Sequence, residues 1–281
     1  MIEILTDSAS DLSGLSGTLG VTVVPLTIIF PEHAYFDGEL TREEFYEKLK
    51  NANPLPSTSQ PSPADFLKYF ERAKREGSDV IVITISEALS GTYQSAAAAK
   101  EMADYERIYL VDSRLATMGE AALVEYAAKL RAEGKSAEEI YETLLEARNR
   151  IKLFALVDTL TYLHRGGRLS KSVTVVGSFL NVKPILALEN GVLVSAGKAR
   201  GFSRGVEAVS ELIKKSGGAD FDLPVYFAHT NARELCSMFM EKLAELDPAF
   251  SCCERVVDIG GVVGTHVGEG TVGVAYFTKD L

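Results

Sequence analysis

Three hydroxyl side chains follow one another at Ser57, Thr58 and Ser59, in a segment rich in proline. Hydroxyl groups are neutral hydrogen-bond donors, which makes a binding role the alternative to a plain turn. The same residue types are common in polar turns, so the segment has two interpretations, a turn or a binding segment. The rest of the chain has to decide between them.

A second hydroxyl cluster occurs in "LSGTYQSA", where Ser90, Gly91 and Thr92 open a predicted helix. The free backbone N–H groups at a helix start can bind an anion, and a glycine lets a ligand come close to the backbone. Ser90 would add a hydroxyl donor, although it is also a good residue to cap the helix. A nucleophilic serine is conceivable here too, but "LSGTY" is not the G-x-S-x-G motif of hydrolases.

His266 lies in "GGVVGTHVGEG", a glycine-rich segment that we expect to be a loop between two strands. Glycines allow a backbone or a ligand to approach closely, so a histidine there is placed to donate to an anion. The alternative is a histidine whose hydrogen bonds are satisfied within the loop.

Alternating strand and helix patterns in the first half predict the elements that position these residues. The β-branched run "DVIVITIS" is typical of a strand buried on both faces, as in a parallel sheet. Thr41 with Glu44, and Ser62 with Pro63 and Asp65, are helix-capping patterns. We predict strands at 2–6, 21–30, 79–86 and 107–113, and helices at 41–50, 63–77, 91–104, 118–133 and 136–150. In an open sheet of this kind, ligands bind beyond the carboxyl ends of the strands.

The second half has a different pattern, which predicts a mixed sheet. Asn190-Gly191 is a strong hairpin-turn signal between two strands. We predict strands at 152–159, 223–230, 251–260 and 271–278, a hairpin over 182–200, and helices at 160–165, 232–245 and from Ser203. The fold class is therefore α/β, with a three-layer domain around a mostly parallel sheet at 1–155 and a second α/β domain at 156–281.

Composition excludes several classes of protein. The net charge of −10 argues against generic nucleic-acid binding, since the phosphate backbone would be repelled. No apolar run reaches the roughly 18 residues of a membrane span, and "MIEILTDSAS" has no basic start, so we expect neither a membrane segment nor a secretion signal. The spacing of the three cysteines and four histidines fits no disulfide framework or metal site, and a reduced cytoplasm is expected.

Basic residues are concentrated between positions 165 and 204, where Glu189 is the single acidic residue. A basic segment in an acidic protein predicts an anion site or a docking face. The alternative is that these side chains scatter over the surface in the folded protein. No P-loop is present in "SAGKAR", and the "GEGTVG" match to G-x-G-x-x-G continues as a strand, so neither is a nucleotide motif.

Seven motifs together resemble the DegV family of bacterial lipid-binding proteins. They are "TDSASDL", "STSQPS", "ISEALSGTYQSA", "VDS", "RGGRLS", "VKPIL" and "GTHVGEGTVG", in the family's order from end to end. The best-understood members are the fatty-acid-binding subunits of bacterial fatty acid kinase. They hold one fatty acid in a tunnel while a separate kinase subunit phosphorylates its carboxylate with ATP.

The resemblance implies a role for several residues of this chain. Thr58 and Ser90 match the hydroxyls that bind the carboxylate, with Ser59 and Gly91 beside them, and His266 and Arg200 match residues near the headgroup. Arg168 matches the arginine associated with kinase docking, and Arg165 lies beside it. The first domain would carry the carboxylate-binding loops, and the second the acyl tunnel and the docking face.

The resemblance also implies a carrier that is not itself an enzyme. Its ligand would be a palmitate-like fatty acid, with no cofactor, metal, nucleic acid or stable membrane insertion, although transient membrane contact is compatible with the role. Two alternatives stay open: a carrier of another lipid without a kinase partner, and a small-ester serine hydrolase that uses Ser90. Candidate tunnel residues are Phe154, Leu156, Leu160, Leu163, Phe179 and Leu180.

Overall fold

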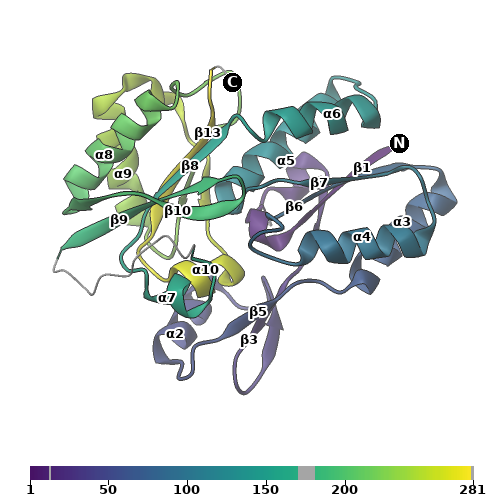
Figure 1. The fold of residues 1–281 in the computed structure, drawn as a ribbon, viewed down its shortest axis with the longest axis horizontal. Helices are drawn as coiled ribbons and strands as arrows, with labels where there is room; N and C mark the ends of the chain where they lie inside the picture. Colours follow the sequence, from purple (N-terminus) through teal and green to yellow (C-terminus); the bar gives the residue numbers. More distant parts are fainter. Residues whose placement is uncertain (13, 170–180, 280–281) are drawn as a thin grey trace.

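Two large sheets on either side of a central helix form the body of the molecule (Figure 1). The structure is a computed structural model and describes residues 1–12, 14–169 and 181–279. The predicted α/β class, with a parallel first sheet and a mixed second sheet, is confirmed.

The first sheet is wholly parallel and has the strand order β2-β1-β6-β7. Its strands are β1 (Ile2–Asp7), β2 (Val21–Val24), β6 (Asp79–Thr84) and β7 (Ile108–Asp112). The run from Val80 to Ile83 is completely buried, as its β-branched composition predicts for a strand covered on both faces.

Alternate side chains of this sheet pack on two helix layers. Val80 and Val82 contact the layer of α3 and α4, whereas Ile81 and Ile83 lie in the cluster with α5 and α6. The helices around this sheet are α1 (Ser16–Leu19), α3 (Pro63–Glu76), α4 (Thr92–Ala103), α5 (Thr117–Ala132) and α6 (Ala137–Ala147). The predicted capping of α3 is confirmed, because Asp65 Oδ2 accepts from Ser62 N at 2.8 Å.

The second sheet is mixed and has the order β10-β9-β8-β13-β11-β12. Its strands are β8 (Ile151–Leu156), β9 (Val182–Glu189), β10 (Val192–Arg200), β11 (Tyr226–His229), β12 (Val256–Asp258) and β13 (Val272–Phe277). The hairpin of β9 and β10 turns at Asn190-Gly191 as predicted. The helices α8 (Phe202–Lys215) and α9 (Arg233–Leu246) cover one face, and α7 (Thr161–Arg165) follows β8.

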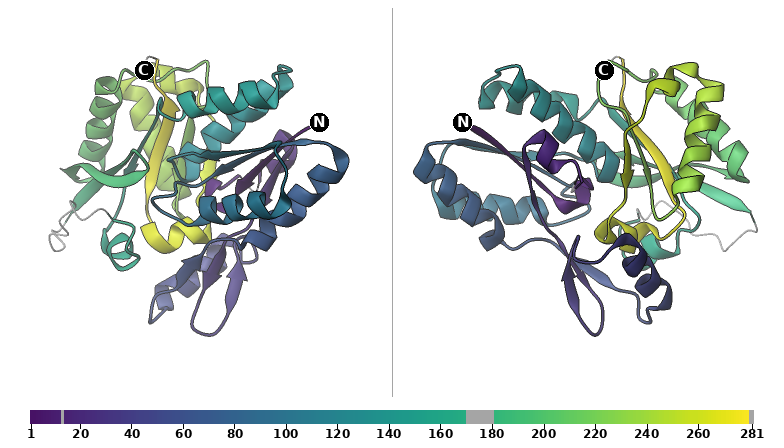
Figure 2. Two further views of the ribbon diagram at one scale, coloured as in Figure 1. Left: turned by 45° about the vertical axis from the view of Figure 1, so that its right-hand side comes forward. Right: turned by 180° about the vertical axis from the view of Figure 1, so that it is seen from behind.

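Helix α5 packs between the two sheets and ties them together (Figures 1 and 2). It contacts β1 and β6 of the parallel sheet and β8, β11 and β13 of the mixed sheet. A helix between two sheets is covered on most sides, and most of its residues from Thr117 to Leu130 are buried, including Glu120, which accepts from Thr6 Oγ1 at 3.0 Å. The boundary at residue 155 stays a prediction; β8, which spans it, is hydrogen-bonded in the mixed sheet.

A small antiparallel sheet in the order β4-β3-β5 is an element that the sequence did not predict. It consists of β3 (Thr27–Ile29), β4 (Ala34–Phe36) and β5 (Ser57–Ser59), beside α2 (Arg42–Asn51). The predicted strand at 21–30 is therefore wrong as one element. It breaks around Pro25, which has no N–H to donate, and its two halves join different sheets.

Two further predictions near the C-terminus are corrected. The expected strand at 251–260 is short, because Pro248–Cys252 forms a 3₁₀ helix before β12. The expected glycine-rich loop contains α10 (Gly261–Val267). A Cβ on Gly261 would lie 2.3 Å from Ile28 Cδ1, so this glycine lets the helix pack directly on the small sheet.

Candidate functional site

The candidate site lies where the strand order of the parallel sheet reverses. The chain runs from β1 to β2 on one side and continues with β6 and β7 on the other. The carboxyl ends of β1 and β6 thus flank a topological switch point, the usual ligand position in open α/β sheets. The segment from Ile85 to Ser90 leaves β6 there, and α10 and the small sheet face it from the other side.

A narrow cavity of about 70 Å³ opens at this point and brings together the two hydroxyls that the sequence singled out. Thr58 and Ser90 both line it, together with His266, Arg168 and Gln60. Thr58 lies on β5, pairs with Ile28 of β3, and places its Oγ1 2.8 Å from His266 Nε2. The segment 57–59 is therefore a strand with one side chain directed at the site, rather than a turn.

Helix α10 holds His266 in place through two carboxylates at its start. Asp11 Oδ1 accepts from Gly260 N at 2.7 Å, and Asp37 Oδ1 accepts from Gly261 N at 3.1 Å. Carboxyl oxygens at a helix N-terminus accept hydrogen bonds from its free backbone donors. The side chain of His266 also packs on Gly166, where a Cβ would lie 2.3 Å from Nδ1.

His266 is a neutral imidazole at physiological pH. Burial, and then the positive charge of Arg168, lower its pKa from the usual value to about 4. Its Nδ1 is buried and has no hydrogen-bond partner among the described residues. A neutral ring beside a hydroxyl forms an uncharged polar pair, which can share a proton with an anion without fixing a full positive charge next to it.

Arg168 contributes the positive charge at this cavity. Its Nη1 donates to Gly166 O at 2.7 Å and its Nε to Leu89 O at 3.3 Å. It follows α7 and the Gly166-Gly167 turn, and it is the single basic side chain among the cavity-lining residues that the structure describes, apart from the neutral His266. A residue expected at a docking face thus also lines the cavity.

A second cavity, of about 60 Å³, continues from the first into the interior. Leu89, Ala116, Leu193, Val263 and Val267 line both cavities, so the two share walls. The deeper one is apolar apart from Thr117, Thr271 and Gly273, with side chains from α5, β8, β9 and α10. Together the two cavities, which we name the tunnel, have polar side chains at one end and mostly apolar side chains at the other.

Not all of the predicted site residues meet at the tunnel. Ser59 is exposed and donates to Gln60 O at 3.3 Å, and Arg200 is exposed at the end of β10. Arg165 is exposed at the end of α7, and Gly91 adjoins the Gln60 side chain. Of the candidate tunnel residues, Leu163 lines the polar end, Phe154 and Leu156 pack in the core cluster beside α8 and α9, and Leu160 packs beside Leu163. Phe179 and Leu180 lie outside the described residues.

Sequence reasoning missed most of the wall of the tunnel. Val262, Val263 and Val267 are on α10, and the predicted loop left no reason to expect a buried face there. The signal was present, because glycines at 261, 264 and 268 recur at helical spacing and place the valines between them. Gln60, directly after the hydroxyl triplet, was missed as well.

The serine-hydrolase alternative finds little support in the hydrogen bonding. Ser90 Oγ lies 2.9 Å from Thr92 Oγ1, while His266 Nε2 bonds to Thr58. A nucleophilic serine needs a base within hydrogen-bond reach, and the histidine of this site is bonded elsewhere. Among the described residues no group of three or more His, Cys, Asp or Glu side chains could hold a metal ion.

Comparison with known proteins gives the family. The model of the DegV family of uncharacterised proteins matches residues 1–279, and the chain belongs to this family. A DegV domain-containing protein of Caldanaerobacter subterraneus is 38% identical over 281 residues, covering 99% of both chains. Protein DegV of Bacillus subtilis is 32% identical, also over 281 residues and 99% of both.

Similar proteins of known structure include fatty-acid-binding proteins. A fatty-acid-binding DegV family protein of Thermus thermophilus has a TM-score of 0.88 and 34% identity, over 98% of this chain and 99% of that one. A stearic-acid-binding protein of Eubacterium ventriosum has a TM-score of 0.88 and 28% identity, over 99% of both chains. DegV of Bacillus subtilis, described as a fatty acid binding protein, has a TM-score of 0.84 and 32% identity, over 99% of both. No described helix of this chain is long and apolar enough to cross a membrane.

Proposed function

We propose that this protein is a fatty-acid carrier that presents the carboxylate of its ligand to a separate ATP-dependent kinase subunit. The observation that carries the proposal is the tunnel, which has Thr58, Ser90 and His266 at one end and an apolar interior at the other. Relatives of the same fold are described as fatty-acid-binding proteins. The carrier works in the cytoplasm and takes no metal or cofactor.

The polar end suits a carboxylate that has to stay reactive. Thr58 and Ser90 offer neutral hydroxyl donors, and His266 is uncharged because its pKa is about 4. Neutral donors hold the headgroup without cancelling its charge, whereas a bidentate arginine pair would bind it more tightly and lower its nucleophilicity. Arg168 Nη1 already donates to Gly166 O, so part of its guanidinium is occupied.

The acyl chain supplies the affinity. Burial of each methylene contributes about 0.8 kcal/mol, so a palmitate-like chain of roughly 14 methylenes contributes on the order of 11 kcal/mol before costs. Association and ordering offset much of this, and slow release is expected. A soluble carrier with slow release suits a ligand that is poorly soluble in water.

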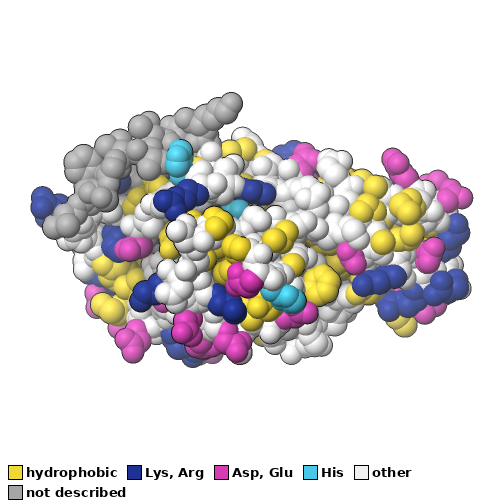
Figure 3. Space-filling model, turned by 90° about the horizontal axis from the view of Figure 1, so that it is seen from below, with side chains coloured by type: hydrophobic (Ala, Val, Ile, Leu, Met, Phe, Trp, Pro, Cys, Tyr) yellow, Lys and Arg dark blue, Asp and Glu magenta, His cyan; other side chains and the backbone are white. Residues whose placement is uncertain are grey.

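In the kinase step, a carboxylate oxygen attacks the γ-phosphorus of ATP. The new O–P bond gives acyl-phosphate, and the bond to the ADP leaving group breaks. The carrier contributes position, and the partner contributes ATP and catalysis. Docking uses Arg165 and Arg168, which lie next to the polar end of the tunnel. Figure 3 shows the face with α7, α10 and the small sheet, where hydrophobic side chains lie beside Lys and Arg side chains.

Native mass spectrometry of the purified protein, followed by fatty acid extraction, is the direct test of the carrier role. We expect a mass excess of one fatty acid per chain, which also identifies the preferred chain length. Protein that is empty, and stays empty after incubation with a panel of fatty acids, would contradict the proposal and make a fluorophosphonate probe of Ser90 the next experiment.

Removal of the hydroxyls tests the headgroup assignment. In Thr58→Val and Ser90→Ala, we expect fatty acid affinity to fall at least about 10-fold each, because a hydrogen bond to a charged acceptor contributes about 1.5–3 kcal/mol. Acyl-phosphate formation with the partner kinase should fall further. Ser59→Ala is the matched control, since Ser59 is exposed beside Thr58 and should retain full binding.

The docking assignment needs a variant that leaves the tunnel intact. Arg168→Glu changes a cavity residue, so it affects the headgroup as well as the docking face. Arg165 is exposed, and in Arg165→Glu we expect retained fatty acid but a reduced rate of phosphorylation by the kinase. Unchanged phosphorylation in this variant, with Arg75→Glu as the control at an exposed arginine of α3, would remove Arg165 from the docking face.

A further inference from the structure

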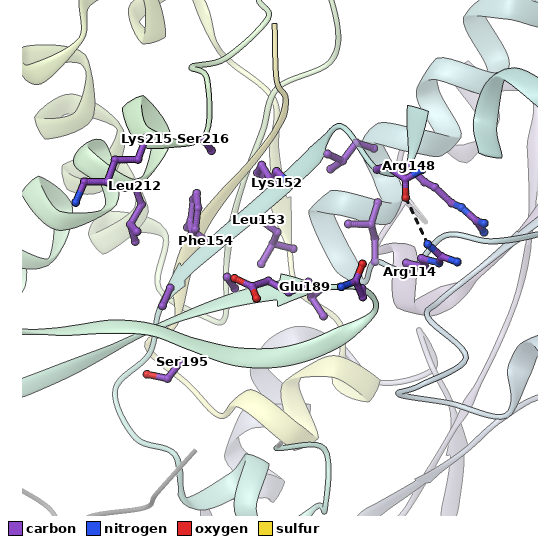
Figure 4. A pocket seen from close by; sticks show the side chains of 17 residues that line it. Arg114, Arg148, Lys152, Leu153, Phe154, Glu189, Ser195, Leu212, Lys215 and Ser216 are labelled. Atoms are coloured by element: carbon purple, nitrogen blue, oxygen red, sulfur yellow. Dashed lines mark hydrogen bonds between the residues drawn. The ribbon is translucent and has the colours of Figure 1, made fainter. Parts of the chain in front are cut away.

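A second, wider opening lies where the mixed sheet is incomplete. Strand β8 pairs with β13 along its whole length, from Ile151 to Leu156, but with β9 only from Phe154 onward. The hairpin of β9 and β10 diverges beyond that point, and a groove of about 620 Å³ opens beside the first half of β8. We name it the basic groove; Figure 4 shows Arg114 and Arg148 at one end and Lys215 of α8 at the other.

The charge of this groove is opposite to that of the protein. Four basic side chains, Arg114, Arg148, Lys152 and Lys215, line it with one acid, Glu189, in a chain whose net charge is −10. Arg114 forms a long ion pair, because its Nε lies 3.9 Å from Asp112 Oδ2. Four basic side chains against one lining acid attract an anion and concentrate it from solution.

Arg148 keeps one donor unused among the described residues. It donates through Nη1 to the backbone oxygen of Asp112 at 2.5 Å, while its Nε is buried and has no hydrogen-bond partner among the described residues. Burial, and then the charge of Arg114, lower the pKa of Arg148, while Asp112 raises it. Arg114 Nη1 donates to Asn149 Oδ1 at 3.4 Å. Both arginines lie beyond the carboxyl end of β7, again at the edge of the parallel sheet where ligands bind.

The floor of the groove is apolar. Leu153 and Phe154 of β8, Leu188 of β9 and Leu212 of α8 line it, with Asn190 and Ser216 as neutral polar groups. The volume falls within the roughly 300–1,000 Å³ of small-molecule sites. A bare inorganic ion would leave this floor unused, so the occupant has an apolar part as well as an anionic group.

We propose that the basic groove is a second ligand site, which binds a phosphate-bearing small molecule with an apolar body. The phosphate lies at the Arg114 and Arg148 end, because arginine forks match phosphate oxygens in pairs. The body lies on Leu153, Phe154 and Leu212, toward Lys215. A nucleoside phosphate and a monoacyl glycerol phosphate share this chemistry, and the experiment separates them.

Isothermal titration calorimetry with three probes tests the site: adenosine monophosphate, octanoyl glycerol phosphate and inorganic phosphate. We expect one of the first two to bind at least tenfold more tightly than inorganic phosphate. Arg114→Gln/Arg148→Gln should weaken that binding at least tenfold. The control Arg75→Gln/Lys129→Gln removes the same charge from exposed positions elsewhere and should leave binding unchanged.

Further arms locate the ligand and guard against a fold defect. Lys215→Gln, at an exposed position, should weaken binding about threefold even if the double variant is unstable. The lipid probe should bind equally well to a Val267→Phe variant, in which the tunnel is blocked. Lost binding in that variant would place the lipid in the tunnel and overturn the proposal for the lipid.

Absence of saturable binding, equal binding of inorganic phosphate, or full binding by the double and Lys215→Gln variants would each overturn the site. Fatty acid content of the same samples is measured separately, so failure here leaves the carrier role untouched.

Discussion

The tunnel and the basic groove are neighbours with opposite designs. Leu153 and Leu188 line both, so these two side chains form part of the wall between them. The tunnel is narrow, with cavities of about 70 and 60 Å³, and its polar end has neutral donors and one arginine. The basic groove is wide, about 620 Å³, and has four basic side chains.

The difference follows from the cost of burying charge. Inside a narrow cavity a cation loses its hydration, and the lowered pKa of His266 is a direct sign of that cost. In a wide groove, water and salt screen most of the basic side chains from one another, so several can accumulate, although burial also lowers the pKa of Arg148. In the two proposed sites, the deeper anion is therefore met by hydroxyls, and the anion nearer the surface by arginine and lysine.

The largest expected effect is a loss of fatty acid affinity when the tunnel is blocked. Val267 lines both tunnel cavities, and in Val267→Phe the larger ring fills their junction. We expect at least a 100-fold loss of fatty acid affinity, measured by native mass spectrometry and competition, at a stability cost of about 1–3 kcal/mol from overpacking. Val192→Phe, on a position that is 37% exposed, is the control. A fully loaded Val267→Phe protein would show that the acyl chain runs elsewhere.

The charge state of His266 tests whether the polar end of the tunnel is dry and uncharged. NMR titration of its ring should show neutral imidazole at pH 7 and a pKa of about 4, because burial and Arg168 both disfavour the imidazolium ion. In Arg168→Gln the midpoint should move upward but stay below the ordinary value, since burial is the larger cause. Arg165→Gln is the control, at an exposed arginine, and a midpoint near 6.5 in the native protein would contradict a dry, neutral polar end.

The smallest expected effect concerns Asp11, which holds the start of α10. Burial raises its pKa to about 7 from an unfolded value near 3.8, so its protonated form is favoured in the folded state. The stability that follows is fully present below pH 3.8 and is lost as pH rises through about 7. Asp11→Asn removes this loss while keeping an acceptor for Gly260 N and tolerating the left-handed backbone at φ 57°.

The Asp11→Asn variant should therefore melt a few degrees above the native protein at pH 8 and equally at pH 4, by circular dichroism. Asp104→Asn is a close control, because Asp104 also has a left-handed backbone, at φ 47°, but is exposed. A native protein whose melting temperature rises between pH 4 and pH 7 relative to Asp11→Asn would refute the assignment.

Local sequence signals predicted the elements that depend on neighbouring residues. The capping pairs Thr41–Glu44 and Ser62–Asp65, the Asn190-Gly191 turn and the fully buried strand at Val80–Ile83 are all present. Each follows from chemistry within a few positions of the chain. The α/β class and the parallel first sheet follow from the same signals, because alternating strands and helices can pack in only a few ways.

Contacts between distant segments could not be predicted in this way. The pairing of Ile28 with Thr58 turns an expected turn into a strand, and the packing of Gly261 on Ile28 turns an expected loop into a helix. The incomplete pairing of β8 with β9, which opens the basic groove, has no local signal at all. Arg200, expected near the headgroup, is exposed at the end of β10.

The sequence by itself determined the types of side chain available, namely two hydroxyls, a histidine and an arginine that suit a carboxylate, and the order of elements that carries them. Only the tertiary structure decided which of them meet. Thr58, Ser90, Arg168 and His266 come from four separate segments, and α10, anchored by Asp11 and Asp37, closes the tunnel between two sheets. The physical reason is that burial and the pKa of a group depend on atoms that are close in space, and most of those atoms belong to residues distant in the chain.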